Sequence, residues 1–406
     1  MLITGPIGRE SMLNWLPLLL IVPALLGSPS ALGGGPTVLP DPPRVTFGRE
    51  MVFSAAVQAG EPVRTAELIF EDDSLHSSSY PVEVSDSDGI TLSARRDLVS
   101  EPVFPFSTIA YWWRVTLDSG DTILSEKQSL VYRDDRFSWQ MIQKGRATVR
   151  WVEGDRASAE DAADLLLLDL GTISADLETP IPENVAVYIY PRLADFHSGL
   201  GKLAHDWEGG VSDPAASIIL LAAAPGAEGR QALAALLPHE TVHLLLGARW
   251  KDAYASLPLW LVEGTAALYE VGSQPDADQA VQRAAKDGSL IPLATLCRSF
   301  PSDESPALLA YAESRSFVGY LRDTYGLTAV RRAMADYAAG AECGQGFSAA
   351  TGKNIETLEK SWRTEVSAKP SGPLAAWAVV LGAFGLLAGV LAAGGIARRG
   401  RKLPRG

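Results

Sequence analysis

The stretch Leu236-Leu-Pro-His-Glu-Thr-Val-His243 decides the fold. Within it, His239 and His243 are one helical turn apart, so on a helix both imidazoles project from one face and can hold one metal ion. Glu240 lies beside them. Two neutral nitrogen ligands, an open coordination position and a carboxylate that takes a proton from water are the parts that a zinc hydrolase needs. The stretch therefore predicts a catalytic metal site.

A third ligand is expected from the stretch Trp260-Leu-Val-Glu-Gly-Thr265. The residues in between give room for a loop and a second helix that returns the carboxylate of Glu263 to the metal. The alternative is a surface helix with unrelated histidines. That alternative fits poorly, because a buried pair of imidazoles beside a carboxylate needs a compensating charge. Burial is indicated by the leucines on both sides of the motif: Leu233, Leu236, Leu237, Leu244, Leu245 and Leu246.

These residues resemble the pattern of the gluzincin metallopeptidases, and the sequence around them is similar to the peptidase MA-like family of the thermolysin clan. The resemblance covers roughly residues 140–367. It implies a thermolysin-like zincin domain that binds one Zn²⁺ per chain through His239, His243 and Glu263. It also implies that Glu240 is the general base and acid in the hydrolysis of a peptide or protein substrate. The substrate itself is not implied.

Two further features concern the residues around the motif. Thermolysin-like enzymes place an acidic residue four positions after the ligand glutamate, where this chain has Ala267. Glu270 lies nearby and could orient a ligand histidine instead. The stretch Ala310-Tyr-Ala-Glu-Ser-Arg-Ser-Phe317 resembles the segment that follows the third ligand in the peptidase MA group. Tyr311 is therefore a candidate catalytic residue that donates a hydrogen bond to the oxyanion, although its phenol could equally be a satisfied core group.

Composition limits the class of protein. The chain has 406 residues, 47% of them hydrophobic, which suits two or three packed domains. Its net charge of -13 disfavours nucleic acid as a partner. Cys297 and Cys343 are the two cysteines, so a cysteine-based metal site is not expected. They are a candidate disulfide if this part is exported, and two separate buried thiols are the alternative.

The N-terminal part divides into three segments. Residues 1–31 are predicted to be a signal peptide, because the apolar run Leu13–Leu26 precedes small residues. An uncleaved anchor is the alternative, but the run is shorter than the ~20 residues that a spanning helix needs. A Pro-rich linker is predicted at 32–43. From 44 to 134, short alternating runs separated by Gly, Asp and Ser turns predict a β-sandwich of the immunoglobulin-like or fibronectin-like kind.

The C-terminal part contains the predicted zinc metallopeptidase domain, residues 138–368, and then a membrane anchor. Residues 374–397 are an uncharged run long enough to cross a bilayer as a helix. The basic residues of the tail, 398–406, place that tail in the cytoplasm by the positive-inside rule. The sequence therefore predicts a single-pass protein of the cell membrane with its N-terminal ectodomain, residues 32 to about 372, outside.

The predicted fold class is α+β: a thermolysin-like zincin domain preceded by an all-β sandwich and followed by a transmembrane helix. The predicted function is that of a membrane-anchored, extracytoplasmic zinc peptidase. A non-catalytic, metal-stabilised surface protein for adhesion or partner binding is the alternative. Glu240 argues against it, because a structural zinc site has no need of a carboxylate that is not a ligand and usually takes a fourth protein ligand.

Overall fold

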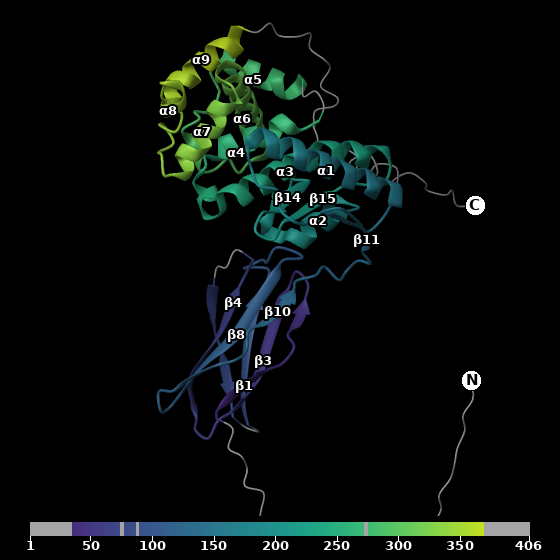
Figure 1. Cartoon of the computed structure of the whole chain (residues 1–406), viewed down its shortest axis with the longest axis vertical. Coiled ribbons are helices and arrows are strands. Elements are labelled where there is room, and N and C mark those ends of the chain that lie inside the picture. The colour runs from purple at the N-terminus through teal and green to yellow at the C-terminus, as the bar shows by residue number, and fades with distance from the viewer. Residues whose placement is uncertain (1–34, 74–76, 87–88, 272–274, 369–406) are drawn as a thin grey trace, which may run out of the picture.

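The computed structural model describes residues 35–73, 77–86, 89–271 and 275–368 of the chain. A β-sandwich at one end of the molecule is followed by a larger body of a mixed sheet and helices (Figure 1). The helices that carry the expected metal ligands lie in this larger body. The predicted signal peptide, residues 1–31, lies outside the described residues.

The sandwich consists of two antiparallel sheets. One sheet has the order β1-β3-β7-β6, with β2 paired to β3, and the other has the order β10-β8-β4-β5, with β9 paired to β8. Alternate residues of β8 face the core, as the period of two in a strand requires, and Trp113 is fully buried there. The strands are β1 (Thr37–Pro40), β2 (Arg44–Thr46), β3 (Glu50–Gln58), β4 (Val63–Glu71), β5 (Ser77–Pro81), β6 (Glu83–Ser85), β7 (Ile90–Asp97), β8 (Thr108–Leu117), β9 (Thr122–Leu124) and β10 (Gln128–Val131).

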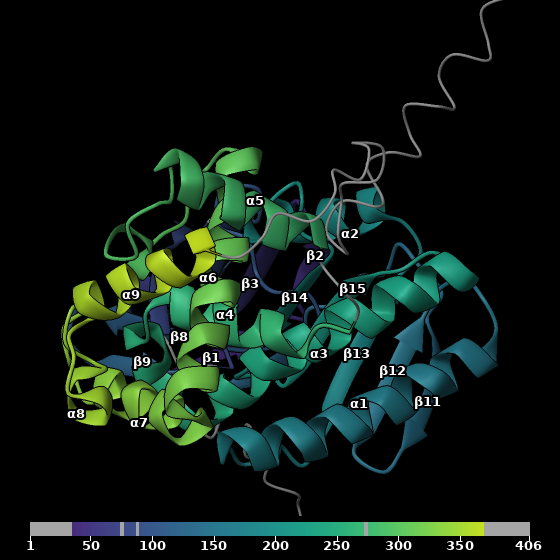
Figure 2. The same ribbon diagram turned by 90° about the horizontal axis from the view of Figure 1, so that it is seen from above.

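The sheet of the larger body has the order β11-β12-β13-β15-β14. Strands β12, β13 and β15 are parallel, and β11 and β14 pair with them in the antiparallel sense at the two edges. One face packs on helices α1 and α3, which lie side by side (Figure 2). The elements are β11 (Gln140–Lys144), β12 (Ala147–Trp151), α1 (Arg156–Leu177), β13 (Val185–Tyr190), α2 (Leu193–Leu200), η1 (Gly201–Leu203), β14 (Gly210–Asp213), β15 (Ile218–Ala222), α3 (Ala227–Trp250) and η2 (Lys251–Ser256).

The opposite face of this sheet rests on α2 and on a loop of the sandwich. Phe106 from that loop stacks on Tyr188 of β13, with ring centroids 3.6 Å apart. Asp134, which is 1% exposed, pairs with Arg136 and accepts a hydrogen bond from the hydroxyl of Tyr190. A buried carboxylate is stable only when it is paired in this way. The sandwich therefore supports the sheet from the side away from α3.

The remaining helices form a compact group beside α3. Helix α4 packs closely on α6, with Gly264 against the backbone of Ser314. A disulfide between Cys297 and Cys343, whose Cα atoms are 6.2 Å apart, joins η3 to the segment between α7 and α8. The elements are α4 (Leu259–Tyr269), α5 (Pro275–Asp287), η3 (Thr295–Cys297), α6 (Glu304–Tyr325), α7 (Leu327–Ala338), α8 (Ser348–Thr351) and α9 (Ile355–Ala368).

The predicted fold class has to be corrected, because it included a transmembrane helix. The structure is a mixed α+β fold, and no helix of the described residues is both long and apolar enough to cross a membrane. Even α3, with 24 residues, carries Glu228, Arg230 and Arg249, so its composition is that of a helix in a globular body. The predicted helix at 374–397 and the tail at 398–406 lie outside the described residues. The other predicted domain boundaries stay predictions.

Candidate metal centre

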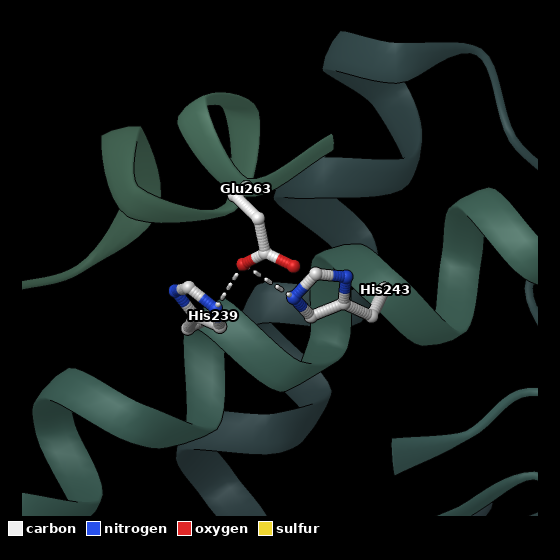
Figure 3. A group of neighbouring side chains, drawn as sticks. All are labelled: His239, His243 and Glu263. Atoms are coloured by element: carbon white, nitrogen blue, oxygen red, sulfur yellow. Dashed lines mark ion pairs between the residues drawn. The ribbon is translucent and has the colours of Figure 1, made fainter. Parts of the chain in front are cut away.

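Two helices bring the expected ligands together. His239 and His243 project from one face of α3, and Glu263 reaches them from α4 (Figure 3). The Nε2 atom of His239 is 3.4 Å and that of His243 is 3.5 Å from Oε2 of Glu263. The ligand atoms of the three residues all lie within 4.8 Å of one another. The structure therefore places these predicted ligands around a single point.

The local sequence explains why these polar groups are buried. Leucines before and after the motif anchor α3 in the core, so the motif enters the interior with them. The side chains of His239, His243 and Glu263 are only 4%, 14% and 13% exposed. Burial raises the pKa of the Glu263 carboxyl, but the two histidines lower it by more, so the group is anionic. The ligand set is thus an anion and two imidazoles in a poorly hydrated site.

The outer nitrogen of each ligand histidine also has a partner. Nδ1 of His239 is 2.8 Å from Oε1 of Glu270, which follows directly after α4. Nδ1 of His243 is 3.0 Å from the hydroxyl oxygen of Tyr254 in η2. In the tautomer that leaves Nε2 free to bind a metal, both Nδ1 atoms carry a proton and donate it to these oxygens. Glu270 thus lies where a carboxylate can orient His239, which Ala267 cannot do.

Glu240 lies between the ligands in sequence but is not one of them. It is 4% exposed, and burial raises the pKa of its carboxyl. Its carboxylate packs against the backbone of β14: a Cβ atom added to Gly210 would lie 2.8 Å from its Oε1 atom. A larger residue at this point of the strand would displace the side chain of Glu240 or Leu221. The arrangement puts a buried carboxylate next to both the metal ligands and an edge strand.

Tyr311, the predicted oxyanion donor, lies on α6 and is partly buried. Its hydroxyl is hydrogen-bonded to the carboxylate of Glu208, and its pKa is raised by burial and by the charges of Glu263, Glu208 and Glu240. Its ring packs edge-on against Phe300. The structure thus brings Tyr311 toward the ligand group, but its phenol already has a partner on the loop before β14.

Sequence reasoning missed two residues of this centre, Glu208 and Tyr254. Glu208 also accepts a hydrogen bond from the backbone N–H of His205, and burial together with the charges of Glu240 and Glu263 raises its pKa to about 7. Neither residue has a spacing that marks it. Glu208 lies just before β14, and Tyr254 reaches His243 only because the chain reverses after α3.

The donor set fits zinc. Two imidazole nitrogens and one carboxylate oxygen, with space for a fourth ligand, are the set that catalytic zinc sites use, whereas Ca²⁺ and Mg²⁺ prefer oxygen ligands alone. Hydrogen bonds to the outer nitrogens of both histidines complete such a site. His239, His243 and Glu263 would hold the ion.

Comparison with known families agrees with this geometry. Residues 169–368 match the Peptidase MA superfamily. These residues, just under half of the chain, are called the Peptidase MA segment below. The match confirms the predicted resemblance and supports a zinc metallopeptidase. The Peptidase MA segment begins inside α1 and includes both helices that carry the ligands, so the sandwich and the first strands of the mixed sheet precede it.

Comparisons of the whole chain give only distant likenesses. No curated protein matches it. An aminopeptidase N family protein from Idiomarina loihiensis is 10% identical, over 84% of this chain and 77% of that one, with a TM-score of 0.44. A mutant M1 zinc metallopeptidase from Deinococcus radiodurans bound to a Tyr-Ser-Ala substrate is 14% identical, over 84% and 95%, with a TM-score of 0.36.

A cycloalternan-degrading enzyme from Trueperella pyogenes is 12% identical, over 27% of this chain and 16% of that one, with a TM-score of 0.18. All three scores are too low for the likeness to carry an argument. The family match therefore stands on the Peptidase MA segment itself and on the ligand geometry within it.

Proposed function

We propose that the protein is a zinc-dependent peptidase that hydrolyses peptide bonds, with Glu240 as general base and acid. One observation carries the proposal. Nε2 of His239, Nε2 of His243 and Oε2 of Glu263 converge on one point, with the buried carboxylate of Glu240 beside them. This is the constellation of a hydrolytic metal site, and a peptide or protein is the substrate class that fits the superfamily.

Each residue has a distinct task in the proposed reaction. Zinc bound by the ligands supplies Lewis-acid chemistry, which polarises a carbonyl and acidifies water. Glu240 accepts the proton of the attacking water and delivers it to the leaving amine. Glu270 holds His239 so that its Nε2 atom faces the ion.

Strand β14 offers a place for the substrate backbone. It is the last strand of its sheet and, among the described strands, it pairs with β15 alone. An extended peptide can therefore add to its free edge as a further strand. Gly210 in this strand touches Glu240, so a peptide bonded there would pass close to the general base. This arrangement supports a peptide over a compact small molecule.

We also propose that the peptidase acts outside the cytoplasm. The disulfide between Cys297 and Cys343 supports this location, because such bonds persist in oxidising compartments. The exclusion of nucleic acid as a partner remains a prediction from the acidic composition.

The alternative of a non-catalytic surface protein has less support. Within the described residues the candidate metal group contains three ligands, whereas a structural zinc site usually takes four from the protein. Glu240 would also be buried at a cost without a role. Both observations favour catalysis.

The test compares Glu240→Gln with Glu228→Gln, a matched change at an exposed position of the same helix. The full-length protein is incubated with unstructured protein and peptide mixtures, and new N-termini are quantified. Glu240→Gln should keep its zinc and lose activity by at least about 100-fold, because proton transfer contributes that much or more. Glu228→Gln should retain activity. Full activity in Glu240→Gln would disprove the proposed role.

A further inference from the structure

The two ligand histidines are held by chemically different partners. His239 donates its Nδ1 proton to a carboxylate, that of Glu270, at 2.8 Å. His243 faces a phenol, that of Tyr254, at 3.0 Å. Because Nε2 of each histidine points toward Glu263, the Nδ1 atoms point outward, and their partners decide how each ring can rotate. The partner of His243 is therefore as relevant to the metal site as that of His239.

The backbone between the two ligand helices places Tyr254. Helix α3 ends at Trp250, and the next residue, Lys251, has φ 48° and ψ -125°, a conformation that residues other than glycine rarely adopt. The backbone N–H of Lys251 bonds to the carbonyl of Gly247. Such a conformation persists only where the surrounding structure holds it. The reversal at Lys251 turns η2 back along α3 and brings the phenol of Tyr254 to His243.

The other end of η2 is also fixed. The backbone N–H of Leu257 bonds to the carbonyl of Tyr254, and Pro258 then caps the start of α4. The ring of Tyr254 packs against the hydrophobic core of the larger body, to which α3 and α4 contribute. The position of Tyr254 is therefore fixed by the two helices that η2 connects, α3 with the histidines and α4 with Glu263. A surface loop would give no such fixed hydrogen-bond acceptor.

The phenol also has a suitable charge. A tyrosine hydroxyl is uncharged near neutral pH, because its usual pKa is about 10. A neutral acceptor orients His243 without adding another negative charge to a region that already contains Glu263, Glu240 and Glu270. A phenylalanine would leave the Nδ1–H group without its acceptor.

We propose that Tyr254 is a positioning residue of the metal site: its hydroxyl oxygen accepts the Nδ1 proton of His243 and so fixes the tautomer and ring orientation in which Nε2 is a ligand. This inference rests on the proposed function, since it requires a metal at the site. Tyr254 itself does not touch the metal or the substrate in this account.

The test uses the full-length protein and the variant Tyr254→Phe, which keeps the aromatic ring. The matched control is Tyr269→Phe, because Tyr269 lies on α4 and donates its hydroxyl to Asp176 of α1 at 3.1 Å and not to a ligand histidine. The zinc dissociation constant is measured by competition with a chromophoric chelator. Tyr254→Phe should weaken zinc binding by about 10- to 100-fold, as other losses of such partners do, and Tyr269→Phe should leave it within about 2-fold.

A spectroscopic measurement separates positioning from loss of stability. The protein is loaded with Co²⁺, whose visible absorption depends on ligand geometry. Tyr254→Phe should change this spectrum, whereas Tyr269→Phe should not, even if both lower the thermal stability of the metal-free chain by similar amounts. Glu270→Gln serves as the reference for a weakened partner on the other histidine and should shift zinc affinity in the same direction.

A measurement on the unmutated protein covers the case in which Tyr254→Phe does not fold. The chain has five histidines, so ¹⁵N-labelled histidine gives few signals. With zinc bound, His243 should show a proton on Nδ1 that exchanges slowly with water. A rapidly exchanging Nδ1 proton, or unchanged zinc affinity and Co²⁺ spectrum in folded Tyr254→Phe, would overturn the proposal while leaving the peptidase function intact. Absence of zinc binding by the wild type would overturn both.

Discussion

The contact between α4 and α6 gives a sharp prediction, because it involves the residue next to Glu263, a candidate metal ligand. Gly264 follows Glu263, and a Cβ atom added to it would lie 2.4 Å from the carbonyl oxygen of Ser314 and 2.6 Å from Cγ2 of Val318. Ordinary contacts begin at 3.4 Å. Gly264→Ala therefore forces the two helices apart by about 1 Å, since a backbone oxygen cannot rotate away.

The expected magnitude follows from two opposing terms. Overpacking against a rigid partner costs about 3 kcal/mol, at the upper end of the usual range. Replacing a helical glycine by alanine returns about 1 kcal/mol through helix propensity. The free energy of unfolding should therefore fall by about 2 kcal/mol. Because Glu263 is the neighbouring residue, movement of α4 should also weaken zinc binding.

Gly319→Ala is the matched control on the partner helix. Its added Cβ would lie 3.6 Å from Cδ2 of Leu268, an ordinary contact, so only the propensity gain of up to about 1 kcal/mol is expected. Urea unfolding of both variants measures the difference, and chelator competition measures the zinc affinity. Equal stabilities for Gly264→Ala and Gly319→Ala would refute the packing argument.

Two other predictions concern stability. Burial raises the pKa of Glu313 to about 7, despite the opposing hydrogen bond from the N–H of Ile291, so the folded state holds its proton more tightly than the unfolded chain, whose value is 4.5. The stability that this group contributes is complete below pH 4.5 and decreases by ~3 kcal/mol as pH rises through 7. The urea midpoint of Glu313→Gln should not show this decrease. If the variant had the same pH profile as the wild type, the assignment to Glu313 would be contradicted. The disulfide Cys297–Cys343 closes a separation of 46 residues, so the double serine variant should lose up to about 4 kcal/mol in unfolding by urea. A loss below about 0.5 kcal/mol would show that the bond adds nothing.

The grouping of the candidate metal ligands could be anticipated from the sequence because their spacing is a local property of helices. His239 and His243 share a face at any place in any helix, and the leucines around them fix which face is buried. Predicting Glu263 was harder, because its position relative to the histidines depends on how the chain turns between the two helices. The short connection between them limits where its carboxylate can lie. Glu270 could also be proposed as a partner of a ligand histidine, because the acidic residue expected at position 267 is Ala267.

The rest depended on contacts that no spacing encodes. Tyr254 reaches His243 through an unusual backbone conformation at Lys251, where glycine would have been the expected signal. Tyr311 is paired with Glu208, which comes from a different part of the fold more than a hundred residues earlier. The docking of Phe106 on Tyr188 likewise joins the sandwich to the sheet through aromatic packing. The transmembrane part of the predicted fold class came from the length of an uncharged run and the basic residues after it, and no described helix has that character.

The measurement that tests the central claim most directly is the zinc content of the purified full-length protein and of His243→Ala. Elemental analysis after purification without chelators should find about one zinc per wild-type chain and a large loss in the variant, because removal of one of three protein ligands opens the site. Equal zinc content in both proteins, or no zinc in the wild type, would contradict the metal site on which this account depends.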